Sequence, residues 1–279
     1  MNIENAYRKA LNFAKNHYEN FPVVSFLIPY DLRKDIAIIY WFARTADNLA
    51  DEGELSENER LRKLENFESR LSDLLKGKHV DDFDFALSET IKNRKLSIEH
   101  FYNLLKAFKQ DVVKKRYHSF EEVLSYCKNS ANPVGRLILE LYDIRDQKAF
   151  EYSDSVCTAL QLTNFYQDTK IDFDKGRNYF PQDEMEKFGV TEIMFLNKGN
   201  SPNLINHVKF NIERARKLFS YGKKLLNFLD GRLKLEIKWT ILSGEAILDK
   251  IEKNNFDVLI ERPKLNKMDF GRLLIKSLF

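Results

Sequence analysis

The amino-acid sequence predicts an all-α protein, and three observations lead to this fold class. Residues that favour helices, such as Leu, Lys and Glu, are plentiful, whereas the 279 residues include only 10 Gly and 6 Pro. Apolar residues recur at spacings of three and four, as in Leu61, Leu64, Phe67 and Leu71, and the period-two alternation of strands is hard to find. Prolines fall between or at the ends of these windows, at positions 22, 29, 133, 181, 202 and 263.

Helical windows follow one another along the whole chain, separated by loops such as KGK, NKGNSPN and ERPK. No repeat, low-complexity tract or linker rich in Gly, Ser or Pro divides the chain, so we expect one domain over residues 1–279. A chain of this length can bury a large core without a metal or a disulfide. The expected helices cover residues 3–18, 31–51, 57–76, 81–94, 98–115, 119–145, 151–172, 202–229 and 231–254.

Charge and cysteine content exclude several classes of protein. The formal net charge is only +3 and both signs are mixed along the chain, so we expect no nucleic-acid partner. Cys127 and Cys157 lack paired or metal-ligand spacing, which predicts buried thiols in a reducing cytoplasm. The N-terminus lacks a signal-peptide pattern, and the longest apolar run, IAIIYWFA, is too short to cross a bilayer. We expect a cytoplasmic protein, with peripheral contact to the inner membrane face left open.

An acidic pair lies in the stretch WFARTADNLADEGE, residues 41–54. Asp47 and Asp51 are four residues apart, so they share one helical face near the C-terminal end of the expected helix. Negative charge there opposes the helix dipole, and the two carboxylates repel each other by roughly 0.2 to 0.5 kcal/mol. A bound cation or ligand would explain the pair. Taken alone, the motif is also compatible with a solvated acidic helix end.

A second acidic stripe lies in residues 161–184, where Asn164, Asp168 and Asp172 are spaced by four. If both stripes face one interior cleft, four carboxylates meet, and they cannot all stay ionised there without counter-charge. Magnesium fits best, because it takes a few carboxylates, keeps waters and binds phosphate oxygens. On this hypothesis, removing one acid costs the metal-free protein no stability. Nearby basic side chains would bind the remaining diphosphate oxygens: Arg44, Lys170, Lys175 and Arg177.

Other catalytic motifs are missing from the sequence. There is no phosphate-binding P-loop and no Rossmann glycine pattern. The five histidines form no metal-ligand pair, and no Ser or Cys lies in a recognisable nucleophile setting. The sequence therefore favours metal-assisted loss of diphosphate over covalent catalysis.

Together these segments resemble the squalene and phytoene synthase family of head-to-head prenyl synthases. The resemblance spans nearly the whole chain and implies an isoprenoid-synthase-type helical barrel around a central apolar channel. The 22 Phe and 12 Tyr are ample for such a channel, although most of them would fill the core. The segments that carry the resemblance are RTADNLADE, NFYQDTKID, QDVVKKRYHSFEEVLSYC, NPVG and KGRNYFPQDE.

Within the family, the chain looks most similar to the bacterial hopanoid-pathway branch that converts presqualene diphosphate into hydroxysqualene. The segments HYENFPVVSFLIP, YCKNSANPVGRLIL and FYQD carry this likeness. Gln167 stands where many members have an arginine, and the glutamate that often precedes the last aspartate is missing before Asp172. These departures argue against a condensation of two substrates.

The resemblance also implies roles for individual residues. The expected catalytic magnesium ligands are Asp47, Asp51, Asp168 and Asp172. Tyr40 and Tyr126 are expected to line the cleft, although Tyr126 could equally be an ordinary buried tyrosine. The other expected substrate-binding residues are His17, Asn20, Phe21, Arg44, Asn164, Gln167, Arg177 and Tyr179.

The implied activity is magnesium-dependent conversion of presqualene diphosphate to hydroxysqualene, without NADPH. Three alternatives stay open: condensation of two farnesyl or geranylgeranyl diphosphates to presqualene, squalene or phytoene; an unrelated all-α metal phosphohydrolase; and a non-catalytic helical subunit. The expected partner is a prenyl diphosphate, and functional coupling to other enzymes of the squalene pathway is open. The basic, amphipathic tail 262–279 could lie on a membrane or pack back onto the domain.

Overall fold

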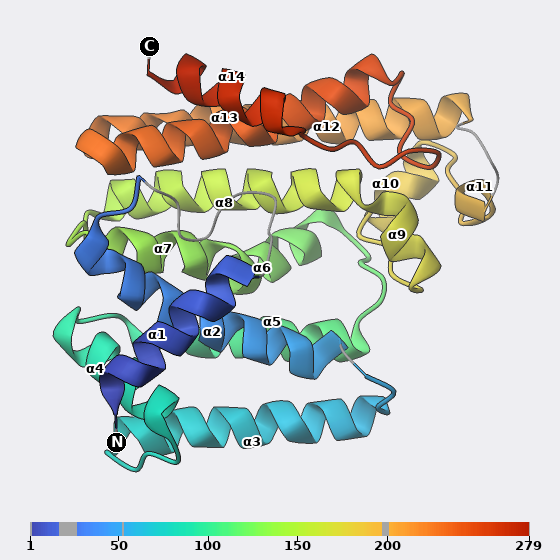
Figure 1. Cartoon of the computed structure of the whole chain (residues 1–279). Coiled ribbons are helices and arrows are strands. Elements are labelled where there is room, and N and C mark those ends of the chain that lie inside the picture. The colour runs from blue at the N-terminus through green and yellow to red at the C-terminus, as the bar shows by residue number, and fades with distance from the viewer. Residues whose placement is uncertain (1, 17–26, 52, 197–200, 279) are drawn as a thin grey trace. The chain divides into compact units, whose positions relative to one another are not determined.

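The computed structural model describes residues 2–16, 27–51, 53–196 and 201–278, and within these ranges every regular element is a helix (Figure 1). The expectation of an all-α protein is therefore confirmed. Across the same ranges, no helix combines the length and the apolar character needed to span a bilayer. His17, Asn20 and Phe21, which the resemblance assigns to the substrate, lie outside the described residues.

The chain forms two compact units. Unit 1 comprises Met1–Val113 and Pro133–Phe150, and unit 2 comprises Lys114–Asn132 and Glu151–Phe279. The expected single domain over residues 1–279 stays a prediction, because compactness alone does not tell whether either unit folds by itself.

Unit 1 is built around α2 (Tyr30–Asp51), which packs against its neighbours along most of its length. The side chains of Ile38, Phe42 and Ala46 are almost fully buried on the packed faces of this helix. The Phe42 ring lies 5.1 Å from Phe67 and 5.2 Å from Phe101 between centroids, which ties three helices together. The helices around α2 are α1 (Ile3–Asn16), α3 (Glu57–Leu75), α4 (Asp82–Asn93) and α5 (Ile98–Val113).

Among its described residues, unit 2 contains three long helices and several short ones. The long helices are α8 (Gln147–Gln167), which begins in unit 1, α12 (Pro202–Gly222) and α13 (Gly231–Lys253). Cys127, in the helix Phe120–Ser130, is fully buried, and burial raises the pKa of its thiol to about 12, as expected for a thiol with no catalytic role. The shorter elements are α6 (Phe120–Ser130), α9 (Thr169–Asp174), α10 (Gln182–Lys187), α11 (Ile193–Leu196), the 3₁₀ helix η1 (Lys223–Phe228) and α14 (Lys267–Ser277).

Several expected helix boundaries are wrong. The expected helix 119–145 is two helices, α6 and α7 (Asn132–Leu141), because Pro133 lacks an N–H and is accommodated only in the first turn of a new helix. The expected helix 151–172 begins at Gln147 and is interrupted at Asp168. The expected helix 202–229 continues beyond Gly222 as 3₁₀ turns. Helices α10 and α11 were not expected, because they are too short to show a period.

The C-terminal tail packs back onto unit 2. Helix α14 lies along α13 (Figure 1), and the Phe270 and Trp239 rings meet edge to face at 6.1 Å. Of the two alternatives for the tail, packing against the domain is the one that the structure contains.

Two glycines of unit 2 provide a matched test of how closely α12 approaches α8. A Cβ added at Gly222 would lie 2.6 Å from Val156 Cγ2 and 2.9 Å from the Val156 backbone nitrogen, so the α8 backbone would have to move. A Cβ added at Gly271 meets nothing within 4 Å. We expect Gly222→Ala to lower the free energy of unfolding by about 1 to 3 kcal/mol. Gly271→Ala should raise it by about 0.5 to 1 kcal/mol, because Ala is the better helix former.

Urea denaturation of the two variants and the wild type measures both effects. Equal effects from the two substitutions would contradict the close approach of α12 to α8.

Candidate functional site

The second acidic motif spans a bend between α8 and α9. Asp168 is the N-cap residue of α9, with φ −101° and ψ 10°. The Asp168 N–H still donates to the Asn164 carbonyl and the Asp172 N–H to the Asp168 carbonyl, both at 2.8 Å. The three polar residues therefore remain about one turn apart, as the sequence predicts, although no single helix carries them all.

Thr169 contributes to the bend. Its buried hydroxyl donates to the carbonyls of Phe165 and Tyr166, each at 3.0 Å. A threonine hydroxyl that bonds to carbonyls of the preceding turn competes with the helical N–H donors and bends the helix. The Thr169 hydroxyl thus supports the interruption at Asp168, and Asp172 follows one turn later in α9.

A Schellman turn then brings the chain back past Asp172. Gly176 has φ +77°, the left-handed conformation that glycine adopts without strain. The Gly176 N–H donates to the Phe173 carbonyl at 2.9 Å and the Arg177 N–H to the Asp172 carbonyl at 2.8 Å, the two bonds of this motif. Arg177 is therefore bonded through its backbone to the residue whose carboxylate its side chain approaches.

The loop after Arg177 is fixed to the segment that precedes α6. The Asn178 N–H donates to the Lys115 carbonyl at 3.0 Å, and the Gln182 N–H donates to the Tyr117 carbonyl at 2.9 Å. The Asn178 side-chain oxygen also accepts from the Phe180 N–H at 3.0 Å. The backbone of the loop is held at both ends, so the side chain of Tyr179 has a defined position.

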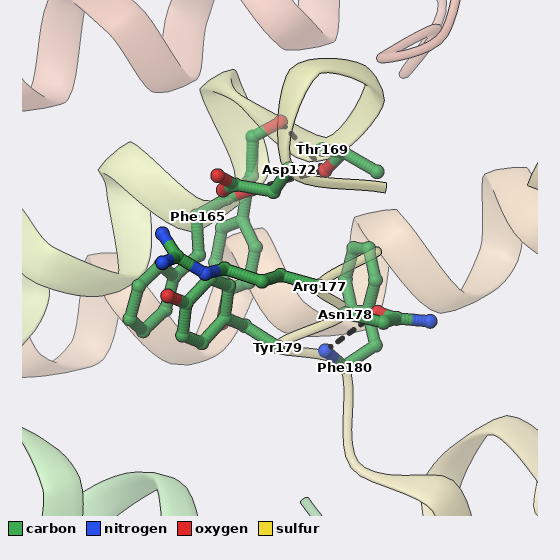
Figure 2. Close-up of a pocket in the computed structure, with 8 residues that line it drawn as sticks. Phe165, Thr169, Asp172, Arg177, Asn178, Tyr179 and Phe180 are labelled. Carbon is green, nitrogen blue, oxygen red and sulfur yellow. Dashed lines mark hydrogen bonds between the residues drawn. The ribbon is translucent and has the colours of Figure 1, made fainter. Parts of the chain in front are cut away.

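These elements enclose a small pocket. Figure 2 shows that the Asp172 carboxylate, the Arg177 guanidinium and the Tyr179 hydroxyl end on the same side of it. An acid, a cation and a phenol on one wall can bind a metal ion, an anion and a neutral hydrogen-bond acceptor, respectively. The pocket is lined by Phe165, Tyr166, Thr169, Asp172, Arg177, Asn178, Tyr179 and Phe180.

Stacked aromatic rings form the apolar wall of the site. The Phe165 and Tyr179 rings are parallel within 6°, with centroids 3.7 Å apart. Tyr117 and Tyr126 lie 5.6 and 6.0 Å from the Tyr179 ring, and Tyr126 is 5% exposed. Tyr126 is thus a buried tyrosine within this cluster, and its expected place along a substrate cleft stays a prediction.

Asp168 has a partner that the sequence did not suggest. Arg262 donates to both carboxylate oxygens, from Nε to Oδ1 and from Nη2 to Oδ2, the latter at 3.0 Å. The Asp168 carboxylate raises the pKa of Arg262, so the guanidinium stays charged. Arg262 belongs to the loop ERPK, and its pairing with a residue 94 positions earlier leaves no local signal in the sequence.

Gln167 binds the same loop, ERPK, that contains Arg262. Its side chain is 2% exposed, and its Nε2 donates to the Pro263 carbonyl. Arg262 and Pro263 therefore bind two consecutive residues of the acidic motif. The expected contacts of Gln167 and of the half-buried Asn164 with substrate stay predictions.

The first acidic motif occupies the last turns of α2 in unit 1. Arg44 Nη1 donates to Asp47 Oδ2 at 2.9 Å, and both side chains are about one-third exposed, so this ion pair is weak and can exchange for another partner. Arg60 of α3 donates to the Ala50 carbonyl at 2.9 Å, which places a positive charge at the C-terminal end of α2. The Tyr40 ring lies 6.1 Å from Phe13.

The donor sets of the two units fit magnesium in kind, although Arg262 already donates to both carboxylate oxygens of Asp168. Within the described ranges, no three side chains of His, Cys, Asp or Glu come together as a metal-binding group. Each unit offers two carboxylates, and magnesium commonly uses one or two carboxylates and fills its other positions with water and phosphate oxygens. Magnesium binding and the meeting of the two motifs stay predictions.

A charged cluster fixes the helix that follows the site loop. Arg214 of α12 donates two hydrogen bonds to the Glu184 carboxylate of α10, and its guanidinium lies 3.6 Å from the Phe120 ring centroid. Burial alone would raise the pKa of Glu184, but the facing side chains of His207 and Arg214 lower it below its ordinary value. Glu184 is part of the quoted segment KGRNYFPQDE, and this role for it was not expected.

The comparisons with known proteins agree with this fold. The family described as squalene/phytoene synthase matches residues 14–269. A crystal structure of squalene synthase HpnC from Alicyclobacillus acidocaldarius has a TM-score of 0.86 and 32% identity, over 91% of this chain and 96% of that chain. A dehydrosqualene synthase structure shares the fold, with a TM-score of 0.89 and 20% identity, over 99% of this chain and 96% of that chain. The 15-cis-phytoene synthase of Synechocystis sp. is 29% identical over 272 residues, 93% of this chain and 80% of that protein.

The ion pair between Asp168 and Arg262 changes the stability effect that we expect when Asp168 is substituted. We expect Asp168→Asn and Arg262→Gln each to lower the free energy of unfolding of the metal-free protein by about 1 to 2 kcal/mol, because each breaks a charge-assisted pair that is three-quarters buried. This replaces, for Asp168, the earlier expectation that losing one acid costs nothing. Denaturation in EDTA measures both variants and the double variant.

The double variant should lose less than the sum of the two single losses. Asp51→Asn serves as the control, and its exposed side chain predicts a change within about 0.5 kcal/mol. Additive losses would contradict the pairing.

The Glu184 cluster predicts a pH dependence. Because the pKa of Glu184 is lowered in the folded protein, its contribution to stability is present above the unfolded-state value of about 4.3 and is lost as the pH falls through the lower folded value. We therefore expect Glu184→Gln to cost roughly 1 to 3 kcal/mol near pH 7. Its stability should approach that of the wild type as the pH falls below about 4.

Urea denaturation of both proteins between neutral and acidic pH measures the difference. A difference that does not change with pH would show that Glu184 acts by packing alone.

Proposed function

The chain belongs to the squalene/phytoene synthase family, and we propose that it converts presqualene diphosphate and water into hydroxysqualene and diphosphate, in squalene and hopanoid biosynthesis. The reaction would use magnesium and no NADPH. The observation that carries the proposal is the neutral, buried side chain of Gln167, at a position where many members of the family have an arginine.

The charge at this position bears on how many diphosphates the site holds. Condensation of two prenyl diphosphates requires positive charge for two bound diphosphates, one of which leaves, whereas the proposed reaction binds only one diphosphate. Gln167 donates its amide hydrogen to Pro263 inside the protein and adds no cation to the second acidic motif. The proposal therefore assigns one diphosphate to the Asp172, Arg177 and Tyr179 wall.

Identity to named relatives supports a squalene-type substrate. The squalene synthase HpnC is 32% identical to this chain, and the phytoene synthases from Oncidium and Synechocystis are 27% and 29% identical.

The residues of the pocket have distinct roles in the proposed reaction. The Arg177 guanidinium offers paired donors to diphosphate oxygens, and the Tyr179 hydroxyl offers one more. Magnesium, when bound by Asp47, Asp51, Asp168 and Asp172 with Asn164 in support, would stabilise the charge of the departing diphosphate as a Lewis acid. The chain itself orients the leaving group, because the Gly176 turn and the Lys115 and Tyr117 carbonyls fix the loop that carries Arg177 and Tyr179.

The aromatic wall suits the carbocation that remains when diphosphate leaves. Each aromatic face can stabilise a cation by roughly 0.5 to 2 kcal/mol. Burial raises the pKa of the Tyr166 hydroxyl, which donates to Asn211 Oδ1 at 3.3 Å, so it stays neutral and cannot capture the cation as a phenolate. Opening of the cyclopropane and addition of one water then give the alcohol, with the water proton released to solvent.

A second function deserves a direct test: the condensation of two farnesyl or geranylgeranyl diphosphates to presqualene diphosphate, squalene or phytoene. The similarity to phytoene synthases over more than nine-tenths of the chain favours it. A non-catalytic helical subunit is the remote alternative, and product formation would exclude it.

The experiment is incubation of the purified protein with each of presqualene, farnesyl and geranylgeranyl diphosphate, with magnesium, with and without NADPH. We expect mass spectrometry to find hydroxysqualene from presqualene diphosphate without NADPH, and no condensation products. Arg177→Gln should lower kcat/KM by about 100-fold or more, because it removes a cation from the leaving group.

Arg216→Gln is the matched control, because Arg216 pairs with Asp249 and Glu252 on the surface of α12 and α13. It should change kcat/KM less than about threefold. Squalene formed only with NADPH, or phytoene formed from geranylgeranyl diphosphate, would overturn the proposal. No product from any substrate would favour the non-catalytic alternative.

A further inference from the structure

Helix α14 has two apolar faces, and only one of them is used within unit 2. The inner face packs toward α13, where Phe270 meets the Trp239 ring and Ser277 is buried. Leu273 and Leu274 are half-buried on the same side. This face alone accounts for the folding of the helix onto the protein.

The outer face carries large apolar side chains into solvent. Met268, Ile275 and Leu278 are 76%, 61% and 62% exposed. Their spacing places them on one stripe along the helix, with Gly271 between the first two. Single exposed apolar residues are ordinary, but here two on α14 and one at its C-cap lie along the same side of the helix. We call Met268, Ile275 and Leu278 the outer stripe.

Basic side chains border the outer stripe on both sides. Lys267 lies on one side, Arg272 and Lys276 lie on the other, and all three are exposed. The acid of α14, Asp269, caps the N-terminus of the helix and binds Lys250 Nζ at 2.8 Å. The outer face therefore presents apolar side chains among positive charges, with its acid held toward α13.

We infer that the outer stripe of α14 docks on the surface of a lipid bilayer that contains anionic headgroups. A helix that lies in the membrane interface buries apolar side chains below the headgroups, while the long stems of Lys and Arg let their charges reach the lipid phosphates. The outer face of α14 has this arrangement. The chain remains outside the hydrocarbon core, because the inner face of the helix stays packed on α13.

The charges make a lipid surface a better occupant than a second copy of this chain. In a two-fold pair the same patch would meet itself, so Lys267, Arg272 and Lys276 of one copy would approach the same residues of the other. Like charges brought together in this way repel each other. An anionic bilayer supplies the opposite charge and an apolar layer together.

The inference does not depend on the proposed reaction. If that reaction is correct, the membrane is also where its water-insoluble product must go. Vesicle binding and turnover are separate measurements, so a negative result in one does not contradict the proposal that the other tests.

The test is flotation of the full chain with vesicles of phosphatidylcholine alone or of phosphatidylcholine mixed with phosphatidylglycerol. We expect binding to the anionic vesicles only, and weaker binding as the salt concentration rises. The paired variants Met268→Ser/Ile275→Ser and Arg272→Gln/Lys276→Gln should each lower the partition coefficient about tenfold or more.

The matched control is Ile193→Ser/Leu196→Ser in α11, where the two side chains are 68% and 66% exposed. This variant should bind vesicles as the wild type does, and thermal melting should show that all variants stay folded. Absence of wild-type binding, or equal losses in the control, would overturn the inference. It would also be overturned if light scattering showed that the α14 variants convert a dimer to a monomer without changing vesicle binding.

Discussion

The backbone turn at Gly176 is the constraint on which the candidate site depends. Its φ of +77° lets the chain reverse after α9, so that the Arg177 N–H bonds to the Asp172 carbonyl. The next residues then reach the Lys115 and Tyr117 carbonyls, and Tyr179 comes to stack on Phe165 at 3.7 Å. An acid, a cation and an aromatic wall, which come from separate elements, are thus placed by one local conformation.

The surroundings of the second acidic motif show how the protein holds its negative charge. Arg262 neutralises Asp168 from within the chain, and Pro263 accepts from Gln167 beside it. In α10, which follows the site loop, Glu184 is held against α12 by Arg214. The motif is therefore part of a balanced network of charges and hydrogen bonds, and whatever binds Asp168 has to compete with a guanidinium that is already in place.

The sequence predicted most long helices, because their amphipathic period is set by their own residues. The sequence-based prediction failed where single contacts, or contacts between distant residues, determine the local structure. The Thr169 hydroxyl contributes to the interruption after α8, and Gly222 matters only because the α8 backbone lies against it. The sequence shows the spacing of Asn164, Asp168 and Asp172. It does not predict the partner of Asp168, because Arg262 lies 94 residues further along the chain. The resemblance identified Arg177 and Tyr179, and the structure places both on one pocket wall.

The buried thiol of Cys127 can report local opening of the helices around it in unit 2. Its thiol is completely enclosed, and burial raises its pKa to about 12, so almost no thiolate exists while the surrounding helices stay closed. Alkylation of this atom must wait for a fluctuation that admits the reagent. The rate of alkylation at Cys127 then measures how often the region around α6 opens, without any label being introduced into the protein.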